Sequence, residues 1–168
     1  MIKIVAYSIL FLAIFSCAQK AEDTIRLIPE GYEGTVLIIF NQEDGMPKEY
    51  EDDKRIYRIP ESGVLRTQFE PNYGIQNHLF FYVDGNGERT EIPFVMTQND
   101  GTIDKNESDK TYAYLEQTIG KVEKYDPDTK ELLYTIEPAR TFYIGKLADV
   151  DKDYQEQLNF TFKHHKNQ

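Results

Sequence analysis

The fold is decided by the stretch Ile28-Pro29-Glu30-Gly31-Tyr32-Glu33-Gly34-Thr35-Val36-Leu37-Ile38-Ile39-Phe40. Pro29 fixes its own φ and directs Ile28 toward an extended conformation, and the two glycines give the backbone freedom to turn. Residues 35–40 then form a run that favours β-structure and contains no charged residue. Because an exposed strand would alternate apolar and polar residues, this run predicts a central strand that has neighbours on both sides and is covered on both faces.

Short segments of β-favouring residues, separated by turn residues, continue along the rest of the chain. The predicted strands are 54–59, 64–69, 78–83, 89–96, 112–115, 118–125, 131–136 and 140–145. We expect 54–59 and 64–69 to form a hairpin, and 78–83 to pair with the central strand. The turn Asp84-Gly85-Asn86-Gly87-Glu88 predicts a second hairpin, between 78–83 and 89–96.

The last predicted hairpin is closed by the turn at 126–129, which carries Pro127 at its second position. Alternation in its returning strand predicts that Leu132, Tyr134 and Ile136 face inward. Near the C-terminus, apolar residues recur at every fourth position and predict one face of a short amphipathic helix. Those residues are Val150, Tyr154, Leu158 and Phe162.

Together these patterns predict a mainly β protein with a single domain at residues 27–168. We expect a sandwich-like or strongly bent antiparallel sheet with one short C-terminal helix. A compact α+β domain is the alternative. The chain has 168 residues, so one domain is the ordinary expectation, and a core of that size needs neither a metal nor disulfides to hold it.

The N-terminus carries the pattern of a secretory leader. Lys3 precedes an apolar run at 4–15 that only Ser8 interrupts, and Cys17 follows Ser16 directly. Twelve helical residues rise about 18 Å, too short for a hydrocarbon core of ~30 Å, so the run predicts a signal peptide at 1–16 and not a transmembrane helix.

The end of this leader resembles the lipobox of bacterial lipoproteins, whose cysteine is acylated, for example with palmitate, and becomes N-terminal. The resemblance implies that Cys17 attaches the protein to a lipid bilayer and that 17–26 is a lipidated tether. An acylated Cys17 leaves no thiol for a disulfide, a metal or catalysis, because the chain has one cysteine. A plain secretory leader with an incidental cysteine is the alternative.

The tether also resembles an export tag that sends lipoproteins of some Gram-negative bacteria to the cell surface. The candidate tag residues are Gln19, Lys20, Glu22 and Asp23. The resemblance implies a lipid-anchored protein of the bacterial outer membrane, exposed on the cell surface if the tag is functional. An ordinary hydrophilic linker would have the same composition.

The charged residues argue against two kinds of ligand, nucleic acid and calcium. Nineteen Lys and Arg stand against 29 Asp and Glu, and this net charge of −10 argues against a nucleic-acid partner, since phosphate backbones require a basic surface. The acidic segments 49–53, 84–88 and 149–153 invite a calcium site, but none has the ligand spacing and central glycine of a calcium loop. We therefore expect no metal and no cofactor.

Two motifs resemble a known family. The first is Ile28-Pro29-Glu30-x-Tyr32-x-Gly34-x-Val36-x-Ile38-x-Phe40, and the second is Tyr57-x-Ile59-Pro60-x-Ser62-Gly63-x-Leu65-x-Thr67. Over about residues 27–84 the chain is similar to a family of exported bacterial lipoproteins that is classed only as a domain of unknown function. The resemblance implies an exported, membrane-anchored domain and supplies no activity or site.

Two functional hypotheses follow from the sequence. The favoured one is a non-catalytic module of the cell envelope that binds a protein or a glycan, because no nucleophile and base are placed in a recognisable motif. The alternative is a hydrolase that uses a pair of carboxylates, for which the many acidic residues are permissive but unspecific. His78 opens a predicted strand, so we expect a structural role for it rather than that of a general base.

Overall fold

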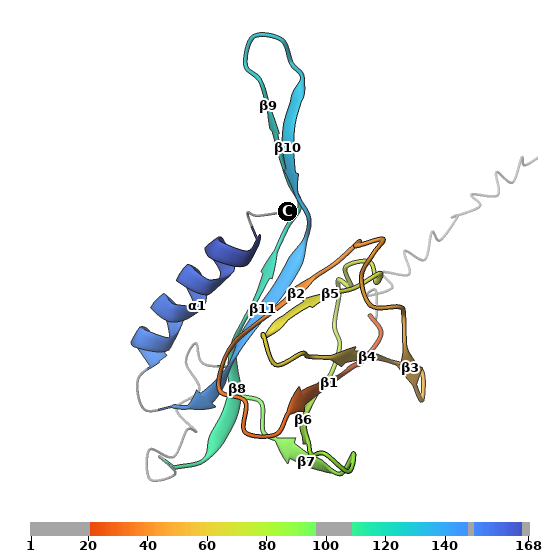
Figure 1. The fold of residues 1–168 in the computed structure, drawn as a ribbon, viewed down its shortest axis with the longest axis vertical. Helices are drawn as coiled ribbons and strands as arrows, with labels where there is room; N and C mark the ends of the chain where they lie inside the picture. Colours follow the sequence, from red (N-terminus) through yellow and green to blue (C-terminus); the bar gives the residue numbers. More distant parts are fainter. Residues whose placement is uncertain (1–20, 97–108, 148–149, 166–168) are drawn as a thin grey trace, which may run out of the picture.

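The computed structural model describes residues 21–96, 109–147 and 150–165. It shows three layers, in which a helix covers one face of a four-stranded sheet and a five-stranded sheet covers the other (Figure 1). The protein is mainly β with one C-terminal helix, as predicted. The signal peptide at 1–16, the lipid-attachment candidate Cys17 and the tag candidates Gln19 and Lys20 lie outside the described residues.

The four-stranded sheet contains the predicted central strand. Its order is β5 (Val64–Arg66), β2 (Gly34–Ile39), β11 (Ala139–Lys146) and β8 (Thr111–Ile119). The prediction for the central strand is confirmed, because β2 lies between two neighbours and the side chains from Val36 to Ile39 are fully buried. Val36 and Ile38 face the five-stranded sheet, and Leu37 and Ile39 pack on the helix side.

The five-stranded sheet is strongly curved. Its order is β3 (Tyr50–Glu51), β4 (Lys54–Arg58), β1 (Thr24–Pro29), β6 (His78–Val83) and β7 (Arg89–Ile92). The antiparallel pairing of β6 with β7 confirms the hairpin predicted at the 84–88 turn. Although β3 and β7 are opposite edges, Arg89 on β7 forms an ion pair of 2.7 Å with Glu51 on β3. The sheet therefore bends far enough to bring its two edges together.

Two predicted strand pairings are wrong. Strands β4 and β5 do not form a hairpin, because the turn at 60–63 carries the chain from one sheet to the other, where β4 pairs with β1 and β5 with β2. Strand β6 pairs with β1 and not with β2. Two apolar strands can meet edge to edge or face to face, and here Phe80 of β6 meets Val36 and Ile38 of β2 across the core.

The pairings of β1 with β4, β1 with β6 and β2 with β5 are parallel, so the sheets are mixed and not purely antiparallel. These parallel pairs arise because the chain passes repeatedly from one sheet to the other instead of turning back within a sheet. Gly63 makes one crossing possible: its φ is +75°, and a Cβ atom on it would lie 2.1 Å from the hydroxyl of Tyr32. That hydroxyl donates a hydrogen bond of 2.5 Å to the carbonyl of Thr35.

The helix α1 (Val150–His165) does not pack with the predicted apolar stripe, but with the stripe one residue earlier along the chain. Its buried side chains are the polar stripe Asp153, Gln157, Thr161 and His165. The Tyr114 hydroxyl donates to Asp153 over 2.5 Å, and Gln157 Nε2 donates to the carbonyl of Leu115 over 2.9 Å. Hydrogen bonds to the sheet thus compensate the burial of Asp153 and Gln157. Phe162 of the predicted apolar stripe is 70% exposed.

The folded domain begins earlier than the predicted boundary at residue 27. Ala21 is buried and its amide donates to the carbonyl of Ile75 over 3.1 Å, and β1 begins at Thr24. The segment expected to be a tether up to residue 26 is thus part of the domain from residue 21 onward. The predicted boundary is too late because Thr24 and Arg26 are polar, as expected of an exposed tether. In the structure both side chains are buried in β1.

Candidate functional site

A β-bulge in β8 determines where its side chains point. The register between β8 and β11 shifts between Thr141 and Tyr143, and opposite this shift Leu115 adopts a φ of +54°. In a regular strand, residues 114 and 116 would point to the same face. With the extra residue, Tyr114 points to the helix and Glu116 points between the two sheets. A left-handed conformation is unfavourable for leucine, and bulges commonly redirect a side chain beside a functional site.

Glu116 meets three basic side chains, and we call Arg26, His78, Glu116 and Arg140 the inter-sheet charge cluster. Arg26 donates to both carboxylate oxygens, with its two terminal nitrogens at 2.7 and 3.4 Å. Nη1 of Arg140 lies 3.4 Å from Oε1, and Nε2 of His78 lies 3.6 Å from Oε2. The cluster joins β1 and β6 of one sheet to β8 and β11 of the other.

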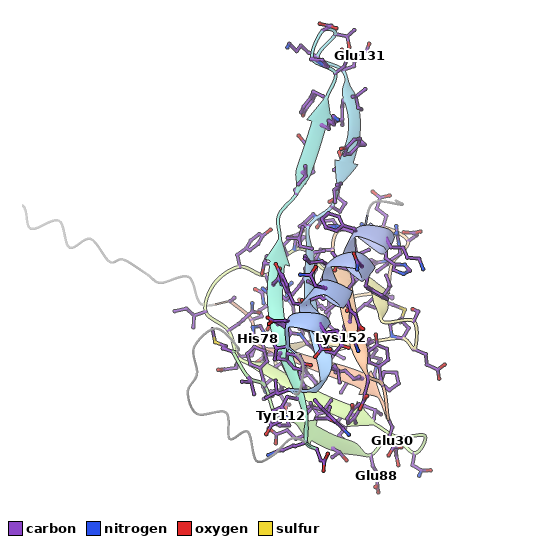
Figure 2. The ribbon with its side chains drawn as sticks, turned by 90° about the vertical axis from the view of Figure 1, so that its left-hand side faces the viewer. Glu30, His78, Glu88, Tyr112, Glu131 and Lys152 are labelled. Carbon is purple, nitrogen blue, oxygen red and sulfur yellow. The ribbon has the colours of Figure 1, made fainter. Side chains whose placement is uncertain are left out.

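The centre of the cluster is sealed from solvent. Arg26 has no exposed surface, and its guanidinium carbon lies 4.6 Å from the centre of the Phe80 ring and 5.0 Å from that of Phe142. A planar guanidinium stacks well on aromatic faces, which stabilises its charge in the absence of water. Figure 2 shows His78 within the body of the domain, far from the hairpin that carries Glu131.

Burial and the neighbouring charges shift the pKa values in this cluster. Burial, together with the charge of Arg26, lowers the pKa of His78 to about 4. Burial alone would raise the pKa of Glu116, but the attraction of Arg26 and Arg140 outweighs it and holds this pKa below its ordinary value. At neutral pH the cluster therefore contains two guanidinium ions, one carboxylate and a neutral imidazole.

This arrangement does not resemble the carboxylate pair of a hydrolase. In the part of the chain that the structure describes, the ionisable groups in contact with the Glu116 carboxylate are all basic, and they keep it ionised. A general acid needs a raised pKa, which is the opposite shift. The other ring nitrogen of His78, Nδ1, lies 2.9 Å from the Thr24 hydroxyl, so both ring nitrogens have a polar neighbour. The described ranges hold no group of three potential metal ligands among His, Cys, Asp and Glu.

A second candidate site is the hairpin of β9 (Val122–Tyr125) and β10 (Leu132–Ile136). It continues β8 and β11 beyond the body of the domain (Figure 1). Five large apolar side chains on it are 43–53% exposed, namely Val122, Tyr125, Leu132, Leu133 and Tyr134. The prediction that Leu132 and Tyr134 face inward is wrong, because the hairpin is a single layer and has no inside.

The two edges of this hairpin differ in chemistry. β9 and β10 pair only with each other among the described strands, so each has one free edge. β9 carries two adjacent charged residues, Glu123 and Lys124, and charged side chains on an edge strand discourage pairing with another strand. The β10 segment Leu132-Leu133-Tyr134-Thr135-Ile136 has no charge and a strong preference for β-structure. β10 is therefore the edge that is open to pairing.

The free edge of β10 is in line with β2. β10 leads into β11, and β11 pairs with β2 on the side away from β8. This line of pairing ends where the amide of Phe40 donates to the carbonyl of Pro138 over 3.0 Å. Asn41 follows with a φ of +57°, and the next two backbone amides turn away from β10: that of Asn41 donates to the carbonyl of Phe69 and that of Gln42 to the carbonyl of Thr67. No strand in residues 21–96, 109–147 or 150–165 pairs with β10 on this side, and we call this free edge the vacant strand position.

The tip of the hairpin is polar and internally bonded. The Asp126 carboxylate accepts hydrogen bonds from the amides of Asp128 and Thr129 over 2.9 and 2.8 Å. These bonds hold the pKa of Asp126 below its ordinary value. They fix the connection between the two strands, so the hairpin is presented as a defined ribbon.

Two of the tag candidates are bound to the domain. Glu22 forms an ion pair with Arg55, and Asp23 accepts hydrogen bonds from the amide and side chain of Asn77 at 2.9 and 3.2 Å.

The inter-sheet charge cluster was not predicted from the sequence. The signal for it is Arg26, a charged residue between apolar ones in Ile25-Arg26-Leu27, since a buried arginine needs a partner elsewhere in the chain.

Comparison with known proteins places the chain in a family. The model of a family described as "Family of unknown function (DUF6843)" matches residues 20–126, which is more than half of the chain. The chain belongs to this family. The match covers the five-stranded sheet and strands β2, β5 and β8 of the four-stranded sheet, and it ends one residue after β9, before β10, β11 and α1. This agrees with the resemblance seen in the sequence, which concerned a family without a known activity.

No curated protein matches the chain. Among solved structures, a 2.75 Å crystal structure from Bacillus anthracis, provisionally described as a lipoprotein, covers 87% of this chain and 98% of its own. The two share 16% identity with a TM-score of 0.47. In the described ranges, the one helix is too short and too polar to span a bilayer.

Proposed function

We propose that this protein is a membrane-anchored lipoprotein whose domain is a non-catalytic binding module of the cell envelope, and that it binds its partner through the β9–β10 hairpin. The observation that carries the proposal is the exposed apolar surface of the hairpin, next to the vacant strand position at β10. The absence of a described carboxylate pair around Glu116 favours binding over hydrolysis.

The anchor in this proposal is an acylated Cys17. Since Ala21 is already buried, only residues 17–20 separate the lipid from the domain, and four extended residues reach roughly 14 Å. The domain would therefore lie close to the membrane surface. Two or more acyl chains bind a bilayer stably, whereas one chain does so only marginally.

Metabolic labelling with a palmitate analogue tests the anchor. The parent should carry the label and sediment with membranes, and Cys17→Ala should lose both properties. A Cys17→Ala variant that stays labelled would refute lipidation at this residue.

For location we propose the outer membrane, with exposure on the cell surface through the candidate tag. The structure suggests how to test the tag cleanly, because Glu22 and Asp23 also make contacts in the domain. Changing only Gln19 and Lys20 to Ala leaves those contacts intact. Protease treatment of intact cells should digest the parent and spare this variant, and equal digestion of both would leave the segment as a simple linker.

The binding mode follows from the chemistry of the β10 edge. A two-stranded hairpin is marginally stable in water, and adding a strand would pair the free backbone groups of β10. A partner strand with alternating apolar residues could lie beside Leu132, Leu133 and Tyr134 and cover the surface that the hairpin exposes. We therefore favour a protein partner that contributes an extended segment over a glycan.

Photocrosslinking in living cells tests this binding mode. A photoreactive phenylalanine in place of Leu133 should give one discrete adduct with another protein. The matched control carries the same group at Glu61, an exposed residue of the turn between β4 and β5. The same adducts from both positions, or none from position 133, would contradict binding through the hairpin.

A further inference from the structure

The inter-sheet charge cluster has an excess of buried positive charge. Arg26 and Arg140 share a single carboxylate, that of Glu116. The fourth member, His78, has its pKa lowered to about 4 and is neutral at pH 7. Two cations and one anion leave one positive charge without a counter-ion inside the cluster. An uncompensated buried charge is costly, and native proteins normally pair it.

The same two arginines also have unused donors. The Nε–H groups of Arg26 and Arg140 are both buried, and neither has a hydrogen-bond acceptor in the described part of the chain. The remaining bonds of Arg140 are long: Nη2 donates to the carbonyl of Asn72 over 3.2 Å, and Nη1 lies 3.4 Å from Glu116. By contrast Arg26 holds Glu116 at 2.7 Å. Of the two guanidinium groups, that of Arg140 is therefore the less well bonded.

One side of the cluster reaches solvent. The side chain of Arg26 is fully buried, whereas those of Glu116, His78 and Arg140 are 12%, 15% and 9% exposed. Phe94 borders this side, with its ring centre 5.9 Å from that of His78. These three partly exposed side chains are the members of the cluster that an ion can approach from solvent.

We propose that the inter-sheet charge cluster is a binding site for a small carboxylate anion, held by the Arg140 guanidinium beside the neutral His78 imidazole. A carboxylate fits for two reasons. Its single negative charge equals the excess charge of the cluster, and its two oxygens match the fork of donors on a guanidinium, as Glu116 already does on Arg26. This site is independent of the hairpin.

The test uses the mature chain in detergent micelles, titrated with sodium acetate at constant ionic strength and pH 7. NMR of the arginine Nε–H groups reports on the donors directly. We expect the Arg140 signal to move with acetate until it saturates, and the signals of Arg58 and Arg89, which pair with surface carboxylates, to stay in place. A shift that grows linearly for all arginines, or no shift, would overturn the site.

Two variants separate the site from general stability. Arg140→Lys keeps the charge but loses the fork, and should weaken acetate binding by about tenfold or more, the usual loss for a charged hydrogen bond. Arg89→Lys, on the surface, should bind acetate as the parent does. If Arg140→Lys fails to fold, the saturation of the parent signal decides alone. Saturation by phosphate and not by acetate would refute a carboxylate ligand.

Discussion

The two halves of one β-ribbon have opposite environments. Strands β8 and β11 form its lower half and lie between the helix and the five-stranded sheet, and β9 and β10 form its upper half and project into solvent (Figure 1). In the lower half Phe142 is fully buried, and in the upper half Tyr134 is among the exposed side chains. Apolar residues thus continue along the ribbon after the layers that would cover them have ended.

This comparison separates what stabilises the domain from what it offers to a partner. In the lower half the polar side chain of Glu116 is held by Arg26 and Arg140, so removing it should damage the fold. In the upper half the apolar side chains have no layer to pack against, so changing them should cost little stability. The predictions below test this separation, beginning with the largest expected effect.

Glu116→Gln should be the most damaging change. It removes the carboxylate and leaves Arg26 and Arg140 as buried cations, which typically costs about 3–5 kcal/mol of unfolding free energy. The matched control is Glu123→Gln on β9, where the ion pair with Lys121 is exposed and should not contribute measurably. Urea unfolding measures the midpoints of both variants. Equal midpoints would contradict the claim that the lower half of the ribbon stabilises the domain and the upper half does not.

Ile38→Ala should cost about 2–5 kcal/mol, because a fully buried aliphatic side chain in the central strand is truncated. Its counterpart in the hairpin is Val122→Ala, which should lie within about 0.5 kcal/mol of the parent. Calorimetry measures the stability of both variants.

The domain should need no metal ion. We expect EDTA to leave the melting temperature unchanged in calorimetry, and a melting temperature that rises by many degrees with calcium would contradict the prediction of a metal-free domain.

Acid should destabilise the domain through His78. Its pKa is lowered to about 4 in the folded state, below the ordinary 6.5. Between these values the unfolded chain binds a proton that the folded chain does not, so stability is complete above pH 6.5 and falls as the pH drops toward 4. The loss should be roughly 2 kcal/mol, allowing for partial solvent screening. The lowered pKa of Glu116 acts in the same direction at lower pH.

Unfolding measured from pH 7 to pH 4 tests this titration. His78→Asn removes the titrating group and should flatten the curve between pH 6.5 and 4. A parent and a variant with the same pH dependence in this window would show that His78 titrates normally.

The sequence predicts those parts of the fold that depend on local chemistry. The run from Val36 to Ile39 and the turn at 84–88 are such features, and both are confirmed. Strand partners were predicted less well, because β6 can bury its apolar side chains either beside β2 in the same sheet or opposite β2 in another sheet. The face of α1 was wrong because the sheet supplies hydrogen bonds to Asp153 and Gln157, which no pattern within the helix reveals.

The candidate sites were predictable to different degrees. Exposed apolar residues on β10 could not be told from core residues, since alternation shows that two faces differ but not whether either is covered. The charge cluster depends on a bulge at Leu115, where the sequence suggested only a break between two strands. Non-local features of this kind require the structure.

The most direct test of binding through the hairpin compares its two edges. Leu133→Lys places a charge on the uncharged edge strand β10, and Val122→Lys adds one to β9, which is already charged. Both side chains are exposed, so each change should leave the melting temperature nearly unaltered. Measured as the crosslinked adduct from a photoreactive group at Thr135, binding should be lost with Leu133→Lys and kept with Val122→Lys. Equal adduct yields from the two variants would contradict the claim that the partner binds along the edge of β10.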